Sequence, residues 1–209
     1  MRYYPIKIPK IFKFIFNKWT WNFSSHKKEI YLTFDDGPLP VITPWVLEQL
    51  NIYNAKATFF CIGENIHKHP EVFQKVISEN HSIGNHTYHH LNGWKTKDVD
   101  YIKNVRSTEK LLSNQSQRLF RPPFGKIKIS QSRKLRELGY QIVMWEVLSA
   151  DFDQKLSARE CVENVLKNVK NGSIVVFHDS EKSFPRLKES LPIILKTLKD
   201  NGYVCKAIP

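Results

Sequence analysis

From residue 29 onward, short apolar runs alternate with longer stretches in which apolar residues recur at helical spacing. Runs rich in β-branched and aromatic residues predict strands, whereas apolar residues three and four positions apart predict helices. We therefore expect strands at Glu29–Phe34, Ala57–Ile62, His81–Asn85, Leu119–Arg121, Tyr140–Trp145, Ser173–Phe177 and Tyr203–Ile208. We expect helices at Pro44–Asn51, Pro70–Asn80, Asp98–Ser113, Ser130–Leu138, Ser157–Val169 and Pro185–Asp200.

This alternation of strands and helices predicts a parallel sheet, because helical crossovers are what connect parallel strands. The pattern does not distinguish an open sheet from a closed barrel, and about 180 residues is short for the eight units of a full βα barrel. In both arrangements the carboxyl ends of the strands meet at one edge, where we expect the chemistry to lie.

The first 28 residues differ from the rest in charge and in apolar spacing. They contain seven basic residues and no acidic residue, whereas residues 29–209 contain 25 basic and 20 acidic residues. Their apolar residues follow a helical stripe made of Ile8, Ile11, Phe12, Ile15, Phe16 and Trp19. We expect a basic apolar arm at 1–28 and a single domain at 29–209. The stripe either packs on that domain or makes peripheral contact with an anionic membrane.

Composition excludes several classes of protein. Of the 209 residues, 41% are hydrophobic and 25% are charged, which is unlike a disordered or collagen-like chain. Three widely spaced cysteines without a C-x-x-C pair exclude a disulfide scaffold and a zinc ribbon. No nucleic-acid-binding motif accompanies the net charge of +12, so we expect no nucleic-acid partner. Lys10 and Lys13 interrupt the N-terminal apolar run, so no secretory signal is predicted and the compartment stays open.

Two of the predicted strands end in residues that could hold a metal ion. Asp35 and Asp36 follow the first strand, and adjacent carboxylates near a buried strand end are costly unless they are paired or metal-bound. His86 and His90 follow the third strand and would share a face on one helical turn. With Asp36 they would form a set of two histidines and one carboxylate that leaves positions open for water and substrate. Solvated turn acids and surface histidines are the alternative.

Further polar residues follow the remaining predicted strands. Arg121 stands before two prolines and could fix a carboxylate. Asp151 follows the fifth strand, and His178 follows the sixth, where it could act as a general acid. Each residue alone is ambiguous, but together with the acids and histidines above they predict a metal-dependent hydrolytic site at one edge of the sheet.

Taken together, these motifs resemble those of the NodB-like polysaccharide deacetylases, carbohydrate esterase family 4, over residues 29–209. The matching motifs are T-F-D-D-G-P at Thr33–Pro38, H-[S/T]-x-x-H at His86–His90, R-x-P-[Y/F] at Arg121–Phe124, and L-x-H as Val176-Phe177-His178. The family's D-x-x-D-W motif is altered, since Leu148 replaces its first Asp, Asp151 keeps the second, and Phe152 replaces the Trp. The groove wall is therefore expected to differ, which leaves sugar preference and substrate length open.

The resemblance implies an α/β fold, a distorted (β/α)7 barrel of the TIM-barrel type in a single domain. It implies hydrolysis of N-acetyl groups on the amino sugars of a chitin-like or peptidoglycan-like polymer or oligosaccharide, and we expect a monomer. It also implies a divalent metal, zinc before cobalt, nickel or iron, held by Asp36, His86 and His90.

The resemblance also implies roles for the other motif residues. Asp35 would be the general base, and His178 would donate a proton to the leaving amine. Arg121 would orient Asp35, and Asp151 would tune Arg121 or His178. The Phe124 backbone N–H would contact the oxyanion beside the metal, Phe152 would form part of the groove wall, and Val176 would line the pocket for the acetyl methyl group.

Two other functions stay open on the sequence. The first is another carbon–nitrogen amide hydrolase on the same barrel, of the deformylase or cyclic-imide type, which would differ in the acid it releases. The second is a non-catalytic carbohydrate-binding relative, which would have no need of base, metal ligands and acid together.

Overall fold

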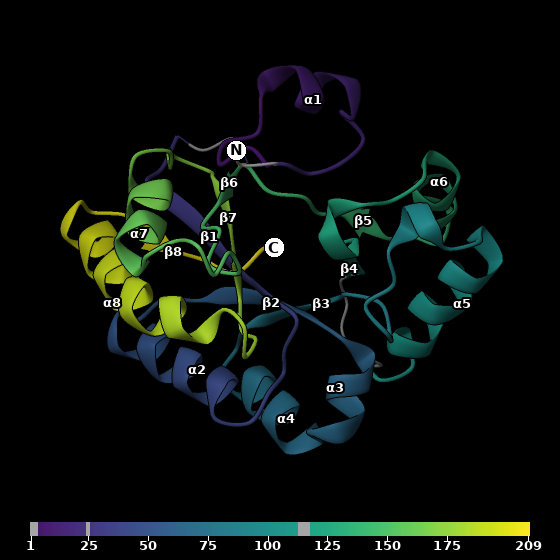
Figure 1. Cartoon of the computed structure of the whole chain (residues 1–209), viewed down its shortest axis with the longest axis horizontal. Helices are drawn as coiled ribbons and strands as arrows, with labels where there is room; N and C mark the ends of the chain where they lie inside the picture. The colour runs from purple at the N-terminus through teal and green to yellow at the C-terminus, as the bar shows by residue number, and fades with distance from the viewer. Residues whose placement is uncertain (1–3, 24–25, 113–117) are drawn as a thin grey trace.

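A computed structural model gives the fold of residues 4–23, 26–112 and 118–209 (Figure 1). Its strands are β1 Glu29–Asp35, β2 Ala57–Cys61, β3 Ser82–Asn85, β4 Leu119–Phe120, β5 Gln141–Ile142, β6 Val147–Leu148, β7 Ile174–His178 and β8 Val204–Cys205. Its α-helices are α1 Lys10–Ile15, α2 Ile42–Ile52, α3 Gly63–Lys68, α4 Pro70–Ser78, α5 Asp98–Glu109, α6 Ile129–Glu137, α7 Ala158–Leu166 and α8 Phe184–Asp200. Two short 3₁₀ helices lie at Gly93–Lys95 and Pro123–Gly125.

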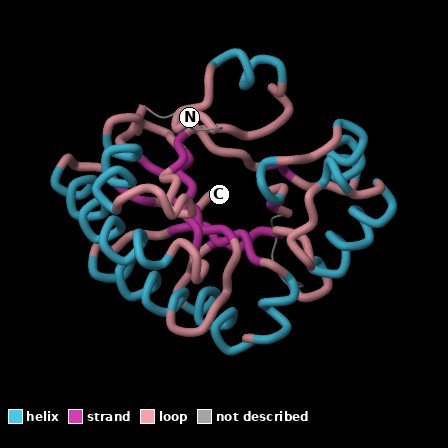
Figure 2. The backbone as a smooth tube through the Cα atoms, viewed as in Figure 1, coloured by secondary structure: helices cyan, strands magenta, loops and turns pink. Residues whose placement is uncertain are grey.

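The strands form one parallel sheet that curves around the centre of the molecule. Their order is β5-β4-β3-β2-β1-β7-β6, and β8 pairs with the start of β1. Most helices cover the outer side of the sheet, and the strands trace an incomplete ring (Figures 1 and 2). This arrangement confirms the predicted distorted βα barrel and places the carboxyl ends of the strands at one edge.

The ring is open between β5 and β6, which do not pair with each other in the described part of the chain. The strand predicted at Tyr140–Trp145 forms over Gln141–Ile142 only, and the strand at Val147–Leu148 was not predicted. Gln141–Ile142 pairs with β4, whereas Val147–Leu148 pairs with β7 at the opposite end of the sheet. The chain crosses from one end of the sheet to the other within residues 143–146, so this crossing links the two ends without a ladder of hydrogen bonds.

The N-terminal arm lies along this opening. Isolated backbone bridges join Lys7 to Val147, Thr20 to Val143 and Asn22 to Ser173. Around the buried Trp21, three residues of the predicted stripe pack on the domain, namely Ile8, Phe16 and Trp19. The continuous helix expected across the stripe is wrong, because α1 spans only Lys10–Ile15 and the chain turns after it. The remaining stripe residues Ile11, Phe12 and Ile15 are exposed.

Most other predicted elements are confirmed within one or two residues, but the helix predicted at Ser157–Val169 ends at Leu166 and the strand predicted at Tyr203–Ile208 ends at Cys205. The helix expected at Asp98–Ser113 ends earlier, at Glu109, and Ser113 itself lies outside the described residues. The helix α3 was not predicted, because only Ile66 of its six residues gives an apolar signal. None of the helices in the described ranges combines the length and the apolar character that crossing a bilayer requires.

Candidate active site

Three side chains that could bind one metal ion converge at the carboxyl edge of the sheet. Asp36 follows β1, His86 follows β3, and His90 lies four residues further on. Asp36 Oδ1 is 3.7 Å from His86 Nε2 and 3.3 Å from His90 Nε2. One ligand atom from each residue lies within 4.8 Å of the others. The structure thus brings together the three residues that the sequence indicated as a metal set.

The backbone turns Asp36 into this cluster. Its φ angle is 85°, a left-handed value that residues other than glycine rarely adopt. The Asp36 carbonyl accepts a hydrogen bond from Asn65 Nδ2 at 2.7 Å, and the N–H of Gly37 donates to the buried carboxylate of Asp179 at 3.0 Å. A Cβ on Gly37 would lie 2.0 Å from Asp179 Oδ2, so the turn needs glycine. These contacts hold the strained residue in place before any ligand binds.

His86 and His90 converge through a loop. Residues 86–90 are irregular, and Thr87 and His90 have φ angles of 63° and 53°. The expectation that one helical turn would bring the two rings together is therefore wrong in its geometry, although the ring centres do lie 5.1 Å apart. Asn104 of α5 holds this loop, because its Oδ1 accepts hydrogen bonds from two consecutive backbone N–H groups, at positions 88 and 89.

The imidazole of His86 is oriented for metal binding. Its Nδ1 lies 2.8 Å from the carbonyl oxygen of Arg121, so Nδ1 carries the proton and donates it there. The lone pair of Nε2 is then left facing Asp36. Burial, with a further effect from His90, lowers the pKa of His86 to about 3, and burial also lowers the pKa of His90. Both rings are therefore neutral near pH 7, as metal ligands must be.

The surroundings of the Asp36 carboxylate show that these residues fit a cation. Its Oδ1 is buried and has no hydrogen-bond partner among the described residues. Burying a carboxylate oxygen without a partner is costly, and a divalent cation shared with His86 and His90 would satisfy it. Two imidazole nitrogens and one carboxylate oxygen form a donor set that zinc accepts. The residues present therefore fit a divalent metal ion.

Asp35, the last residue of β1, is paired with a fully buried arginine. Arg121 Nη1 donates to Asp35 Oδ1 at 2.7 Å and to the hydroxyl oxygen of Thr33 at 2.6 Å. Its other guanidinium nitrogens donate to two backbone carbonyls between β5 and β6. Burial lowers the pKa of Arg121, and the charge of Asp35 opposes that shift. One arginine therefore fixes Asp35 through its side chain and His86 through its backbone.

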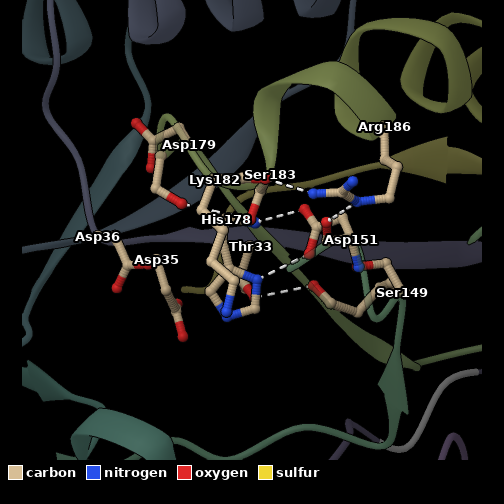
Figure 3. Close-up of polar contacts among 12 residues, drawn as sticks. Thr33, Asp35, Asp36, Ser149, Asp151, His178, Asp179, Lys182, Ser183 and Arg186 are labelled. Carbon is tan, nitrogen blue, oxygen red and sulfur yellow. Dashed lines mark hydrogen bonds and ion pairs between the residues drawn. The ribbon is translucent and has the colours of Figure 1, made fainter. Parts of the chain in front are cut away.

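On the other side of Asp35, His178 forms a dyad with Asp151. His178 Nδ1 lies 2.8 Å from Asp151 Oδ1, and the His178 backbone N–H donates to Oδ2 at 2.8 Å. Burial alone would lower the pKa of His178, but the charge and hydrogen bond of Asp151, with smaller effects from Asp36 and Asp35, raise it to about 9. Asp35 and His178 are register partners in adjacent strands. Figure 3 shows the His178 imidazole between the Asp35 and Asp36 carboxylates on one side and Asp151 on the other.

The three residues expected to contact substrate are exposed to different degrees. Phe124 is 59% exposed, and its ring centre lies 4.5 Å from that of His90. Phe152 is half-buried and packs edge-on against His178 at 5.2 Å. Val176 is almost fully buried. The two phenylalanines therefore border the polar groups on opposite sides, one beside a metal-set histidine and one beside the dyad.

The altered fourth motif is packed against the N-terminal arm. Leu148, at the position of the motif's first Asp, belongs to a buried cluster with Val176, and Tyr4 and Ile6 of the arm pack against that cluster. The Leu148 N–H donates to the Ile6 carbonyl at 2.9 Å. The Tyr4 ring lies 5.2 Å from that of Phe152, and its hydroxyl donates to the Asp153 carboxylate. This part of the wall is therefore an apolar surface built partly by the arm.

Sequence reasoning missed several residues that hold the site in place. Asp179 is fully buried, and besides the Gly37 N–H it accepts a hydrogen bond from the Thr43 hydroxyl at 2.5 Å. Burial raises the pKa of Asp179 to about 8. Arg186 of α8 donates from Nε to the carbonyl oxygen of Asp151 at 2.5 Å. An acid directly after an apolar strand was an available sign for Asp179, whereas Arg186 lies among other polar residues of a helix and gives none.

Comparison with known proteins identifies the family. The family model for polysaccharide deacetylase matches residues 23–143. A peptidoglycan-N-acetylglucosamine deacetylase of Bacillus cereus is 37% identical over 187 residues, which is 88% of this chain and 88% of that protein. The peptidoglycan-N-acetylmuramic acid deacetylase PdaA of Bacillus subtilis is 29% identical over 192 residues, or 88% of this chain and 72% of PdaA.

Solved structures extend the likeness beyond the span of the family model. The crystal structure of the Bc1960 peptidoglycan N-acetylglucosamine deacetylase superposes with a TM-score of 0.88 at 33% identity, covering 95% of this chain and 94% of that one. A mutant of BA3943, a CE4 family pseudoenzyme with restored enzymatic activity, gives a TM-score of 0.80 at 26% identity, over 90% of this chain and 68% of the other. The chain therefore belongs to the polysaccharide deacetylase family, the carbohydrate esterase family 4 that its strand-end motifs resemble.

Proposed function

We propose that this protein is a divalent-metal-dependent hydrolase that removes the N-acetyl group from amino sugars of peptidoglycan. The observation that carries the proposal is the meeting of three kinds of group at one edge of the sheet. These are the metal set of Asp36, His86 and His90, the Asp35–Arg121 pair, and the His178–Asp151 dyad. Amide hydrolysis needs an activated water, a base and an acid, and each group suits one of these needs.

Asp36, His86 and His90 are the residues that would hold the metal. A divalent ion bound there supplies Lewis acidity, which polarises the acetyl carbonyl and lowers the pKa of the attacking water. The protein's own contribution is to keep both imidazoles neutral and to hold the His86 ring through the Arg121 carbonyl. The backbone N–H of Phe124, a residue whose ring centre lies 4.5 Å from that of His90, would donate to the oxyanion that develops on the acetyl group.

Asp35 is the proposed general base. Its carboxylate takes a proton from the attacking water while the water oxygen forms a bond to the acetyl carbon. Arg121 keeps Asp35 in one orientation through the 2.7 Å contact, and because Arg121 is fully buried it cannot swing out to solvent. Fixing a base in this way lowers the reorganisation that proton transfer would otherwise need.

His178 is the proposed general acid. As the carbon–nitrogen bond breaks, His178 Nε2 gives a proton to the leaving sugar amine, and acetate is the second product. Asp151 accepts a hydrogen bond from the Nδ1–H of His178, which fixes the tautomer and favours the protonated ring. With its pKa raised to about 9, His178 carries the needed proton near neutral pH.

Substrate contacts are proposed from Phe124, Phe152 and Val176. The two aromatic rings border the polar groups and would pack against sugar rings, and Val176 belongs to the apolar cluster next to Phe152 and would pack behind the acetyl methyl group. The choice of peptidoglycan over chitin rests on the names of the relatives, several of which are peptidoglycan deacetylases. Which of the two amino sugars of peptidoglycan is the substrate depends on the groove wall, where Leu148 stands in place of the Asp of the family's fourth motif.

The test is acetate release from purified peptidoglycan by the full chain, before and after removal of metal with a chelator. We expect release that stops on chelation and returns with added zinc. Chitooligosaccharides, an N-formyl substrate and a cyclic imide serve as competing substrates under the same conditions. Faster release of formate, or opening of the imide, would contradict the deacetylase proposal in favour of another amide hydrolase. Binding of peptidoglycan without release of any acid would indicate a non-catalytic relative.

A further inference from the structure

The helix α1 carries the densest exposed apolar surface in the described part of the chain. It buries none of its residues. Exposed fractions are 58% for Ile11, 47% for Phe12, 76% for Phe14 and 60% for Ile15. The other large apolar side chains that are exposed come singly from different places, namely Val41, Ile52, Trp94, Val99, Phe124, Ile129, Ile193 and Val204. Clustered exposure of this kind marks an interaction site, whereas isolated exposed residues are ordinary.

This apolar surface is held away from the barrel. Before α1, the N–H of Ile8 donates to the Glu146 carbonyl at 3.0 Å, and after α1 the N–H of Thr20 donates to the Ile142 carbonyl at 2.8 Å. Trp21 is buried beyond that, and its indole N–H donates to the Phe16 carbonyl. Figure 1 shows α1 projecting from the side of the barrel where the ring of strands is open. Because both ends are fixed, α1 has no freedom to fold its apolar residues back onto the core.

The arm that carries α1 has only positive side-chain charges. Residues 1–28 contain seven basic residues and no acidic one. Lys13 turns inward to the buried carboxylate of Glu146, which further ties the arm to the barrel. Lys10 and Lys18 stay exposed on either side of the apolar residues. The surface therefore consists of four large apolar side chains bordered by outward-facing cations, which we call the α1 surface.

We propose that the α1 surface docks on the interface of a membrane that contains anionic lipids. Apolar side chains can enter the boundary between headgroups and acyl chains, while lysines beside them meet anionic headgroups. A second copy of this chain fits less well, because a symmetric contact would bring together two arms that each carry seven basic residues and no acid to pair with them. This proposal concerns a surface distinct from the metal set and does not depend on the proposed activity.

The test is co-sedimentation of the full chain with vesicles of phosphatidylglycerol and phosphatidylcholine in about equal parts, and with vesicles of phosphatidylcholine alone. We expect binding to the anionic vesicles that weakens as salt is raised. The variant Lys10→Gln with Lys18→Gln should bind about 25-fold more weakly, since each of the two lysines near such a surface contributes about a fivefold factor. The matched control is Lys103→Gln with Lys199→Gln, which changes the same charge elsewhere and should affect binding far less.

A second pair of variants tests the apolar part. Phe14→Ser with Ile15→Ser should lose most of the vesicle binding and keep its melting temperature, because both side chains are exposed. Val99→Ser with Ile193→Ser removes equally exposed apolar residues from other helices and should bind like the original chain. Binding that is absent, equal on neutral vesicles, or unchanged in Phe14→Ser with Ile15→Ser would overturn the proposal. So would a dimer in sedimentation velocity that this variant dissociates, since the α1 surface would then serve self-association.

Discussion

The two sides of the candidate active site are built in different ways. The metal-and-base side consists of Asp35, Asp36, His86, His90 and Arg121. The acid side consists of Leu148, Asp151, Phe152 and His178. On the first side the groups are tied to one another, since Arg121 alone contacts both Asp35 and the His86 ring. On the second side a single polar pair stands beside an apolar wall that includes residues of the N-terminal arm.

This difference separates the polar groups proposed for the chemistry from the apolar wall proposed for substrate contact. On the metal-and-base side, removing one charged partner leaves another buried and unpaired, as with Asp35 and Arg121, which costs several kcal/mol in buried pairs. The acid-side wall is made of packing contacts that can be exchanged with smaller effect. We therefore expect changes on the metal-and-base side to abolish turnover, and changes in the acid-side wall to alter substrate affinity.

The largest effect is expected from the metal-set histidines. His86→Ala or His90→Ala removes one of the three proposed metal ligands, so bound zinc and acetate release should both fall to background, while the far-ultraviolet circular dichroism stays unchanged. His89→Ala is the matched control. His89 lies between the two in sequence, is exposed, and contacts Asn104 outside the metal set. Elemental analysis gives the metal content, and full activity in a metal-free His86→Ala protein would refute the assignment.

The adjacent acids should separate metal binding from proton transfer. Asp35→Asn should keep its zinc and lose about 10²–10⁴-fold in kcat, the usual contribution of a general base. Asp36→Asn should instead bind zinc more weakly and regain part of its activity at high zinc concentration. Titration of activity against free zinc distinguishes the two variants. The reverse pattern would mean that the roles of the two acids are exchanged.

The dyad on the acid side should set the alkaline limit of activity. A general acid must be protonated, so activity should fall as pH rises through the pKa of His178, which is raised to about 9. Asp151→Asn removes the largest cause of that rise, so the pKa falls and the alkaline limb of kcat moves to lower pH. Asp200→Asn, in an exposed pair with Lys196, is the control and should leave the profile unchanged. An alkaline limb that does not move in Asp151→Asn would remove His178 as the acid.

Much of the barrel could be predicted because its strands and helices have strong local patterns. The strand β1, buried along most of its length, and the helix α7, with its capping box of Ser157 and Glu160, form where expected. The opening between β5 and β6 could not be predicted, since residues 140–148 are mostly apolar and contain no Gly, Pro, Asn or Asp that would separate two strands. The apolar character of a segment predicts that it is buried but does not predict which strand it pairs with. The pairing of β6 with β7 joins residues that are far apart in the sequence, so local patterns do not reveal it.

The candidate site, too, could be predicted only in part. The positions of Asp36, His86 and His90 at strand ends were enough to predict that they meet, because parallel strands bring their carboxyl ends to one edge. The loop geometry of His86–His90 was predicted wrongly, since spacing alone does not reveal a positive φ at Thr87. The contribution of Tyr4 to the acid-side wall could not be predicted either, because it depends on how the N-terminal arm runs along the opening between β5 and β6.

The smallest effect is expected at Tyr4, where a substitution tests most sharply whether the acid-side wall serves substrate contact. Tyr4→Ala removes the ring that packs on Phe152, and aromatic pairs of this kind contribute about 0.5–1.5 kcal/mol. If the wall serves substrate contact, KM for a long glycan should rise about two- to tenfold, with kcat nearly unchanged. Tyr4→Phe keeps the ring and loses only the hydroxyl that donates to Asp153, so it should lie between Tyr4→Ala and the original chain.

A double variant that combines Tyr4→Ala with Phe152→Ala tests whether the arm affects substrate affinity through the Phe152 ring. If it does, the double variant should be little worse than Phe152→Ala alone, because the partner that Tyr4 supports has already been removed. Phe14→Ser is the control, since it alters the arm at the exposed α1 and away from the wall. A fall in kcat as large as that of Asp35→Asn would contradict the separation of chemistry from substrate contact, because Tyr4 packs on the Phe152 ring and that ring packs in turn on His178.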